Sequence, residues 1–307
     1  MILNNESGSL KIKITRENEN NNILDFLIKD YNFSQRLLRR LKKSNSIFLN
    51  GKSASVRETI FCDDILEILF EDEKLNYEPE KMNLKILYED GDILIVDKEP
   101  FMVVHPTKTH LNNTLANGIA DYFIKNNIKK RIRFVNRLDM NTSGIIIIAK
   151  NSYAHQYIQN QMQEKTIKKK YIAILTNSFP YDEGIIELPI GKLESGDIKR
   201  KVFDGGKDSI TIFKTLESFK KNGAVVEIDL KTGRTHQIRV HFSHYNNSLL
   251  GDDLYGVKSS LIDRQALHSF YLRIKVPREK DFIEINSDLP DDMKKVITKL
   301  RDDNYGI

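Results

Sequence analysis

The sequence of 307 residues contains a single cysteine, Cys62, and no long apolar run. One cysteine excludes an internal disulfide and a metal site built from several cysteines. No segment approaches the ~18 consecutive apolar residues of a membrane-spanning helix, and the opening residues lack the apolar stretch of a signal peptide. We therefore expect a cytoplasmic protein without disulfides.

Charge is present in nearly equal amounts of both signs, with 48 Lys and Arg against 43 Asp and Glu and a net charge of +5. Charged residues make up 30% of the chain and hydrophobic residues 40%, which indicates a globular protein rather than a disordered chain or a membrane bundle. The charges are segregated, however. Basic residues gather in 29–57, 129–137 and 165–170, and acidic residues gather in 71–80 and near the C-terminus.

The first 75 residues predict a small module with a basic helix. Ser34 is placed to cap a helix that runs to Lys43, and its leucines form one apolar stripe. Strands are expected at 47–52, which ends in an Asn-Gly turn, and at 65–70. A core of this size is marginal, so an accessory domain is expected rather than an enzyme. A separate basic stripe on the helix contains Arg36, Arg39, Arg40 and Lys43.

The remainder of the chain predicts one large α+β domain at 85–307, after a linker at 76–84. Apolar runs at 93–96 and 145–149 indicate strands that are buried on both faces. Further strands are expected at 171–175 and 224–230, and helices at 115–124 and 152–162.

Two segments carry the residues best suited to chemistry. Asp139 lies among turn-forming residues between two expected strands, where a loop can hold a carboxylate rigidly at the edge of a cleft. The alternative is that Asp139 only caps a turn. In the second segment, 230–241, Thr235 could cap a helix, but the apolar spacing fits a strand equally well. Its histidines lack metal-binding spacing, so no metal site is expected.

These motifs resemble those of the RluA-type pseudouridine synthases. Residues 136–144, Asn-Arg-Leu-Asp-Met-Asn-Thr-Ser-Gly, are similar to the family signature H-R-L-D-x-x-T-S-G. Residues 169–171 resemble its tyrosine motif and 231–241 its arginine motif, while 96–98, 105–106 and 266–268 match further positions in family order. Residues 1–75 resemble a small RNA-binding module found ahead of this catalytic domain. Asn136 departs from the pattern, because the family usually has His there.

The resemblance implies a fold, a reaction and roles for several residues. The fold would be a mixed, mostly antiparallel central sheet with flanking helices and loops, preceded by a small α/β RNA-binding domain. The reaction would isomerise uridine in RNA without a cofactor or metal, after the base has been flipped out of the stack. Asp139 would be the nucleophile, Arg234 the cation that keeps it charged, and Tyr171 the residue that stacks on the base and moves a proton. Arg137 would fill the vacated place in the stack, or alternatively contact a phosphate.

The expected partner is RNA, and the protein is expected to act as a monomer. Large-subunit ribosomal RNA is the expected substrate, with transfer RNA as the alternative. Two other classes stay open: a ribosome-assembly factor without catalytic activity, and a glycoside hydrolase, which would need a second carboxylate about 5–9 Å from Asp139. The expected RNA contacts are the basic stripe Arg36, Arg39, Arg40 and Lys43, the run Lys129, Lys130, Arg131 and Arg133, and the group Lys165, Lys168 and Lys169.

Overall fold

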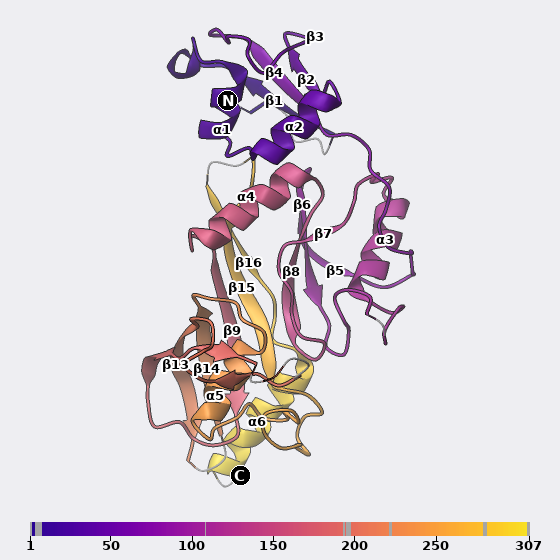
Figure 1. Cartoon of the computed structure of the whole chain (residues 1–307). Coiled ribbons are helices and arrows are strands. Elements are labelled where there is room, and N and C mark those ends of the chain that lie inside the picture. Colours follow the sequence, from indigo (N-terminus) through magenta and orange to yellow (C-terminus); the bar gives the residue numbers. More distant parts are fainter. Residues whose placement is uncertain are drawn as a thin grey trace.

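The protein forms a small N-terminal sheet and a large central sheet with helices packed around them. The structure, a computed structural model, describes residues 2–3, 8–107, 109–192, 194, 198–220, 223–278 and 281–305. Figure 1 shows the small sheet at the N-terminal end and helix α6 (Asp291–Tyr305) at the opposite end. No helix in the described ranges is both long and apolar enough to cross a membrane.

The N-terminal module confirms the predicted basic helix and hairpin. The Ser34 side chain accepts a hydrogen bond from the backbone N–H of Leu37, which caps α2, and the three leucines of that helix are buried. Asn50 and Gly51 both have positive φ, as the tight turn between β2 and β3 requires. The elements are β1 (Ser9–Lys13), the 3-10 helix η1 (Arg16–Asn18), α1 (Ile23–Lys29), α2 (Gln35–Lys43), β2 (Ile47–Leu49), β3 (Lys52–Ser53) and β4 (Ile65–Leu69).

The central sheet has ten strands and confirms the predicted mixed, mostly antiparallel architecture. All its pairings are antiparallel except that of β8 with β15, which is parallel. In spatial order the main path is β10 (Glu183–Glu187), β13 (Ile210–Phe219), β14 (Gly223–Leu230), β9 (Lys168–Leu175), β15 (Leu267–Lys275), β8 (Ser143–Ala149), β6 (Ile93–Lys98) and β5 (Lys85–Glu89). Strand β16 (Phe282–Asn286) pairs with β15, β7 (Arg133–Phe134) pairs with β8, and β11 (Ile190–Gly191) forms a ribbon with β12 (Lys201–Val202).

Strand β8 is buried on both faces, as its apolar run predicts. Ile146 and Ile148 belong to the cluster that includes apolar residues of α3 (Leu115–Lys125). Ile145 and Ile147 belong to a second cluster, which includes apolar residues of α4 (Ser152–Gln163). This strand is therefore a rigid base for the turn that precedes it, because displacing it would disturb packing on both sides of the sheet.

The N-terminal module packs directly against the central sheet. Tyr153 of α4 is 1% exposed, and its ring lies against Phe33 and Phe70 of the module. Nearby, Arg278 donates two hydrogen bonds to the buried carboxylate of Asp92 and a third to the carbonyl of Ser9. The two parts are thus joined by a buried apolar contact and a buried ion pair.

The basic run at 129–133 holds the connection between the two parts. Lys130 is 3% exposed, and its ammonium donates to the carbonyls of Phe70 and Glu71. Arg133 donates to both carboxylate oxygens of Glu73. The expectation that this run contacts RNA is therefore wrong for Lys130, which is buried. The guanidinium of Arg133 is already paired with the carboxylate of Glu73.

Candidate active site

Asp139 lies in a tight turn between β7 and β8, as the sequence predicts. The backbone N–H of Thr142 donates to the carbonyl of Asp139 at 3.0 Å, which closes the turn. Gly144 follows with φ +116°, and a Cβ there would lie 2.2 Å from the carbonyl oxygen of Ser269. Only glycine permits β8 and β15 to approach this closely.

Buried side chains hold the turn from below. The Lys98 ammonium donates to the carbonyl of Met140 at 3.0 Å, and Arg264 donates to the carbonyl of Asn141 at 3.1 Å. Both cations are 1% exposed. Because they donate to carbonyls one and two residues after Asp139, they hold the backbone of the turn in place.

Asn136, the residue that departs from the family signature, has a structural role. Its side-chain amide donates to the carbonyl of Ile145 and accepts from the N–H of Ile147, at 3.1 and 2.8 Å. It therefore hydrogen-bonds to the backbone of β8 as a neighbouring strand would, and it joins the start of the turn to that strand.

The cation beside the Asp139 carboxylate is Arg239. Its guanidinium donates to Oδ2 of Asp139 at 3.2 Å. The same group donates through Nε and a second nitrogen to both oxygens of Asp252, each at 2.7 Å. Burial opposes the charge on Arg239, but the hydrogen bonds and attraction of Asp252 and Asp139 outweigh it and raise its pKa.

The prediction that Arg234 is this cation is wrong. The exposed side chain of Arg234 donates from Nε to the backbone carbonyl of Asp208 at 3.1 Å. The reason is the local backbone: His236 has φ +60° and precedes α5 (Gln237–His244), so the first turn of that helix carries Arg239 inward. The prediction that Thr235 caps the helix is also wrong, because the cap position is His236.

His236 provides a second polar contact to Asp139, with 3.7 Å between Nε2 and Oδ2. The Tyr255 hydroxyl accepts from the backbone N–H of Arg200 at 2.7 Å and forms a hydrogen bond of 2.8 Å with Nδ1 of His236. Burial lowers the pKa of His236, despite the opposing attraction of Asp139.

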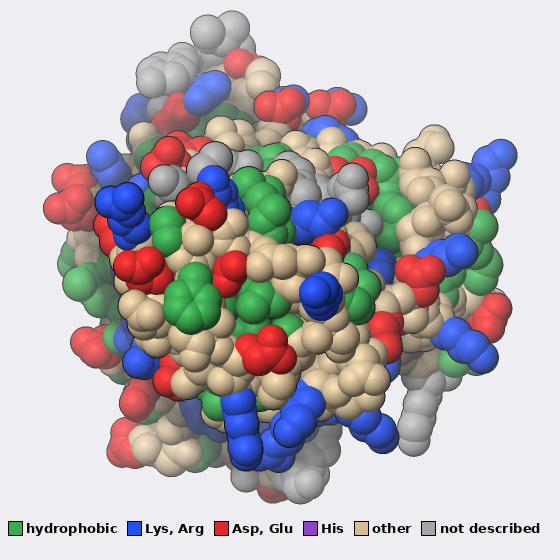
Figure 2. Space-filling model, turned by 90° about the horizontal axis from the view of Figure 1, so that it is seen from above, with side chains coloured by type: hydrophobic (Ala, Val, Ile, Leu, Met, Phe, Trp, Pro, Cys, Tyr) green, Lys and Arg blue, Asp and Glu red, His purple; other side chains and the backbone are tan. Residues whose placement is uncertain are grey.

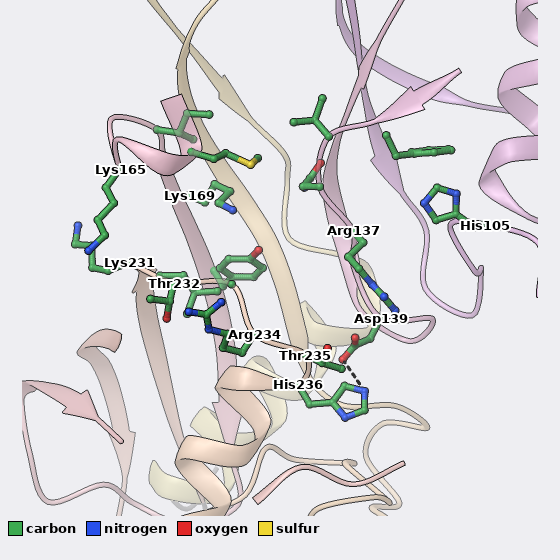
Figure 3. A pocket seen from close by; sticks show the side chains of 18 residues that line it. His105, Arg137, Asp139, Lys165, Lys169, Lys231, Thr232, Arg234, Thr235 and His236 are labelled. Carbon is green, nitrogen blue, oxygen red and sulfur yellow. Dashed lines mark ion pairs between the residues drawn. The ribbon is translucent and has the colours of Figure 1, made fainter. Parts of the chain in front are cut away.

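Asp139 lines a pocket of about 460 Å³ together with three other residues that the sequence selected, Arg137, Tyr171 and Arg234. Arg137 and Asp139 come from the turn before β8 and Arg234 from the segment before α5, as Figure 3 shows, and Tyr171 comes from β9. Tyr171 is 6% exposed, and burial raises its pKa to about 12. Tyr171 therefore keeps its proton at neutral pH and can donate a hydrogen bond within the pocket.

The basic stripe of α2 lies in the N-terminal module, and none of its residues lines this pocket. Arg36, Arg39 and Lys43 are exposed, but Arg40 donates to Ser152 of α4 and lies 3.6 Å from Glu73. Arg40 is therefore engaged at the contact between the two parts. Figure 2 looks onto this end of the molecule and shows lysine and arginine side chains interspersed with acidic ones.

The polar groups that line the pocket are protein side chains. Among the residues that the structure describes, no three His, Cys, Asp or Glu side chains lie together as a possible metal site. Asp139 is also the one carboxylate among the described residues that line the pocket. This arrangement offers one nucleophile or base, a protonated phenol and several cations.

Comparison with known proteins agrees with the motifs. The family model described as RNA pseudouridylate synthase matches residues 92–244, which include Asp139, Tyr171 and Arg239. The RNA pseudouridine synthase YlyB of Bacillus subtilis is 35% identical over 301 residues, covering 96% of this chain and 99% of its own length. The ribosomal large subunit pseudouridine synthase D of Neisseria meningitidis is 33% identical, covering 91% of this chain and 78% of its own.

Solved structures show the same fold. The human RNA pseudouridylate synthase domain containing 1 superposes with a TM-score of 0.57 at 25% identity, covering 73% of this chain and 97% of that one. The human RNA pseudouridylate synthase domain containing 4 gives a TM-score of 0.58 at 20% identity.

Proposed function

The chain belongs to the RluA-type RNA pseudouridine synthase family of isomerases, and from this premise we propose that it converts uridine to pseudouridine in large-subunit ribosomal RNA, with Asp139 as the nucleophile. The observation that carries this proposal is the single carboxylate among the described residues that line the pocket. It belongs to Asp139, which accepts a hydrogen bond from Arg239 and lines the pocket together with Tyr171. The choice of RNA is supported by the name of the relative from Neisseria meningitidis.

The geometry supports Asp139 as an ionised nucleophile. The reaction breaks the bond between N1 of uracil and C1′ of ribose, turns the base and rejoins it through C5, which loses its proton while N1 gains one, so no oxidant or reductant is needed. A carboxylate can add either to the ribose or to the ring. Arg239 supports the charged carboxylate from one side and His236 from the other, while the clamped turn holds it in place.

Tyr171 and Arg137 are suited to handling the flipped nucleotide. A uridine inside folded RNA cannot reach Asp139 until it leaves the stack. We propose that the base then lies against the ring of Tyr171, whose proton stays in place at neutral pH. Arg137, two residues before Asp139, lines the same pocket and can stack in the vacated place. Arg234 lies at the exposed edge of the pocket, where it can meet an RNA phosphate.

We expect ribosomal RNA from a strain that lacks this protein to have lost pseudouridine at one or a few positions of the large subunit. Purified protein should restore the modification in that RNA. The measurement is position-specific mapping of pseudouridine in both ribosomal and transfer RNA, before and after incubation. Loss in transfer RNA alone would transfer the activity to the alternative substrate. Unchanged maps in both RNAs would contradict an enzymatic role and favour an assembly factor.

We also propose that the N-terminal module binds RNA through the exposed cations of α2. Replacing Arg36, Arg39 and Lys43 together with glutamine should weaken RNA binding and flatten its salt dependence. Each phosphate contact contributes about 0.9 to the slope of log affinity against log salt on duplex and about 0.7 on single strands. The slope should therefore fall by about 2 to 3 when affinity for substrate RNA is measured between low and moderate salt.

A triple variant at the opposite end of the molecule provides the matched control. Lys294, Lys295 and Lys299 are exposed on α6 and carry the same total charge. Replacing them with glutamine should leave the slope nearly unchanged. An equal fall in both triple variants would mean that net charge, rather than α2, sets the affinity. Substitution is preferable to deleting residues 1–75, because deletion would expose Tyr153 and break the Arg278 contact to Ser9.

A further inference from the structure

Lys169 is a cation inside the catalytic pocket that the roles described so far leave unused. It lies on β9 two residues before Tyr171, and side chains of a strand alternate between faces. Ile167, Lys169 and Tyr171 accordingly line the pocket, whereas Lys168 and Lys170 do not. Figure 3 shows the Lys169 side chain in the wall of the pocket.

Among the described residues, the side chain of Lys169 has no hydrogen-bond or ion-pair partner, in contrast to Lys170 and Lys231. Lys170 pairs with Glu227 at 2.8 Å, and Lys231 pairs with Asp229 at 2.6 Å. Among the hydrogen bonds and ion pairs formed within the described ranges, none involves Lys169. Burial lowers its pKa, with no nearby charge to offset the effect. Lys169 is half-buried in the wall of the pocket, and partial burial of an ammonium without an acceptor is unfavourable, so the site suits a partner that arrives with the substrate.

Among the described residues that line the pocket, no carboxylate is left to pair with the Lys169 ammonium. Asp139 is the one carboxylate among the described lining residues, and Arg239 and His236 already contact its Oδ2. The partner is therefore an oxygen of the bound nucleotide. An ammonium has three donors and no acceptor, which matches a carbonyl or anionic oxygen and conflicts with an amino group.

The position of Lys169 favours the base over the phosphate. Two residues along a strand span about 7 Å, so a uracil ring that lies on Tyr171 brings its carbonyl edge within reach of the lysine side chain. Lys165 and Arg234 line the same pocket with exposed side chains, which places them better for the RNA backbone. Lys169 is half-buried, whereas Lys165 and Lys168 are exposed, so the lysines of this basic run do not share one environment.

We propose that the Lys169 ammonium binds a carbonyl oxygen of the flipped uracil and stabilises the negative charge that forms there during the reaction. This inference rests on the proposed function. It holds for both possible routes. If Asp139 attacks C1′, the C1′–N1 bond breaks and its electron pair stays on the uracil, where the carbonyl oxygens share the charge. If Asp139 adds to C6, the C5–C6 π pair moves into the ring carbonyl and leaves the charge on O4.

Single-turnover kinetics on the mapped target RNA test the proposal. Lys169→Met should reduce the rate of pseudouridine formation by about 10²- to 10³-fold, as expected when one donor to a developing oxyanion is removed. RNA affinity should stay within about threefold. Lys169→Arg keeps the charge and should recover at least a tenth of the wild-type rate. Lys295→Met, which removes the same charge from an exposed position on α6 outside the pocket, should change the rate by less than about twofold.

Stability separates this role from a structural one. Because Lys169→Met removes a half-buried charge whose side chain has no partner among the described residues, the melting temperature should be unchanged or higher. A lower melting temperature together with lower activity would show that Lys169 supports the fold. A normal rate with weaker, less salt-dependent binding would show that it contacts a phosphate. Either result overturns the proposal.

A substituted substrate identifies the atom. Sulfur accepts hydrogen bonds poorly, so 4-thiouridine at the target position should slow the wild-type enzyme. It should slow Lys169→Met little further if the two changes remove the same contact. If the rate losses from Lys169→Met and 4-thiouridine add, Lys169 does not contact O4, and the same comparison with 2-thiouridine tests a contact to O2. If the losses add for both thiouridines, the proposal is overturned. If the wild-type protein forms no pseudouridine, the proposed function itself fails, which is a distinct outcome.

Discussion

Asp139→Asn is expected to reduce the single-turnover rate of pseudouridine formation by at least about 10⁴-fold, as loss of a nucleophile does in other enzymes. The amide keeps the size of the side chain and can still accept from Arg239, but it cannot add to ribose or uracil at a useful rate. RNA affinity should stay within a few-fold, because Asp139 is acidic and makes no favourable contact with phosphate. Chromatographic analysis of nucleosides from the incubated target RNA measures the rate, and filter binding measures affinity.

Asp302→Asn is the control for this substitution, since Asp302 is exposed on α6 and should tolerate the change without loss of rate. Turnover by Asp139→Asn at even a hundredth of the wild-type rate would refute the assignment of Asp139 as nucleophile. Loss of RNA binding in parallel with activity would indicate that the variant has lost its pocket. A melting curve close to that of the wild type excludes that explanation.

The position of Asp139 could be predicted because it depends on local sequence. Turn-forming residues precede a continuous apolar run, and such a run becomes a buried strand wherever the chain places it. The capped helix α2 and the Asn-Gly hairpin follow from equally local rules. Each of these features needs only the residues within a few positions of it.

The partner of Asp139 could not be predicted in the same way. Arg234 and Arg239 lie five residues apart in a segment whose spacing fits a helix or a strand, and the choice between them depends on where α5 begins. That start follows from the left-handed backbone at His236, a conformation that His adopts more often than most residues but still uncommonly, so that its identity alone does not predict it. The contact of Arg239 to Asp139 joins residues 100 positions apart.

The sequence also could not predict which charged residues are exposed to solvent. Lys130 and Arg36 both lie in basic runs, yet one is buried under the connection at residues 70–73 and the other faces solvent. Composition fixes how much charge a segment carries, whereas tertiary packing decides which charges remain available for RNA. This is why the runs at 29–57 and 129–137, which are both rich in basic residues, have different surroundings.

The second large effect is expected at Arg239. Arg239→Met should lower the free energy of unfolding by about 3–5 kcal/mol, because it leaves the fully buried carboxylate of Asp252 without its charge partner. The rate should fall by at least about 10²-fold, since Asp139 loses the guanidinium that supports its charge. Thermal unfolding and single-turnover kinetics measure the two effects. Arg234→Met should leave stability nearly unchanged, because Arg234 is exposed and contacts a backbone carbonyl.

A double variant separates stability from catalysis at this site. Asp252→Asn removes the buried charge but keeps an acceptor for the backbone N–H groups of Leu254 and Tyr255, which donate to Oδ1 at 3.1 Å. Combined with Arg239→Met, it should recover much of the lost stability, because no buried charge is left unpaired. The rate should not recover, since Asp139 still lacks its cation. If activity returned together with stability, Arg239 would matter only for folding, and the cation that supports Asp139 would have to be sought elsewhere in the pocket.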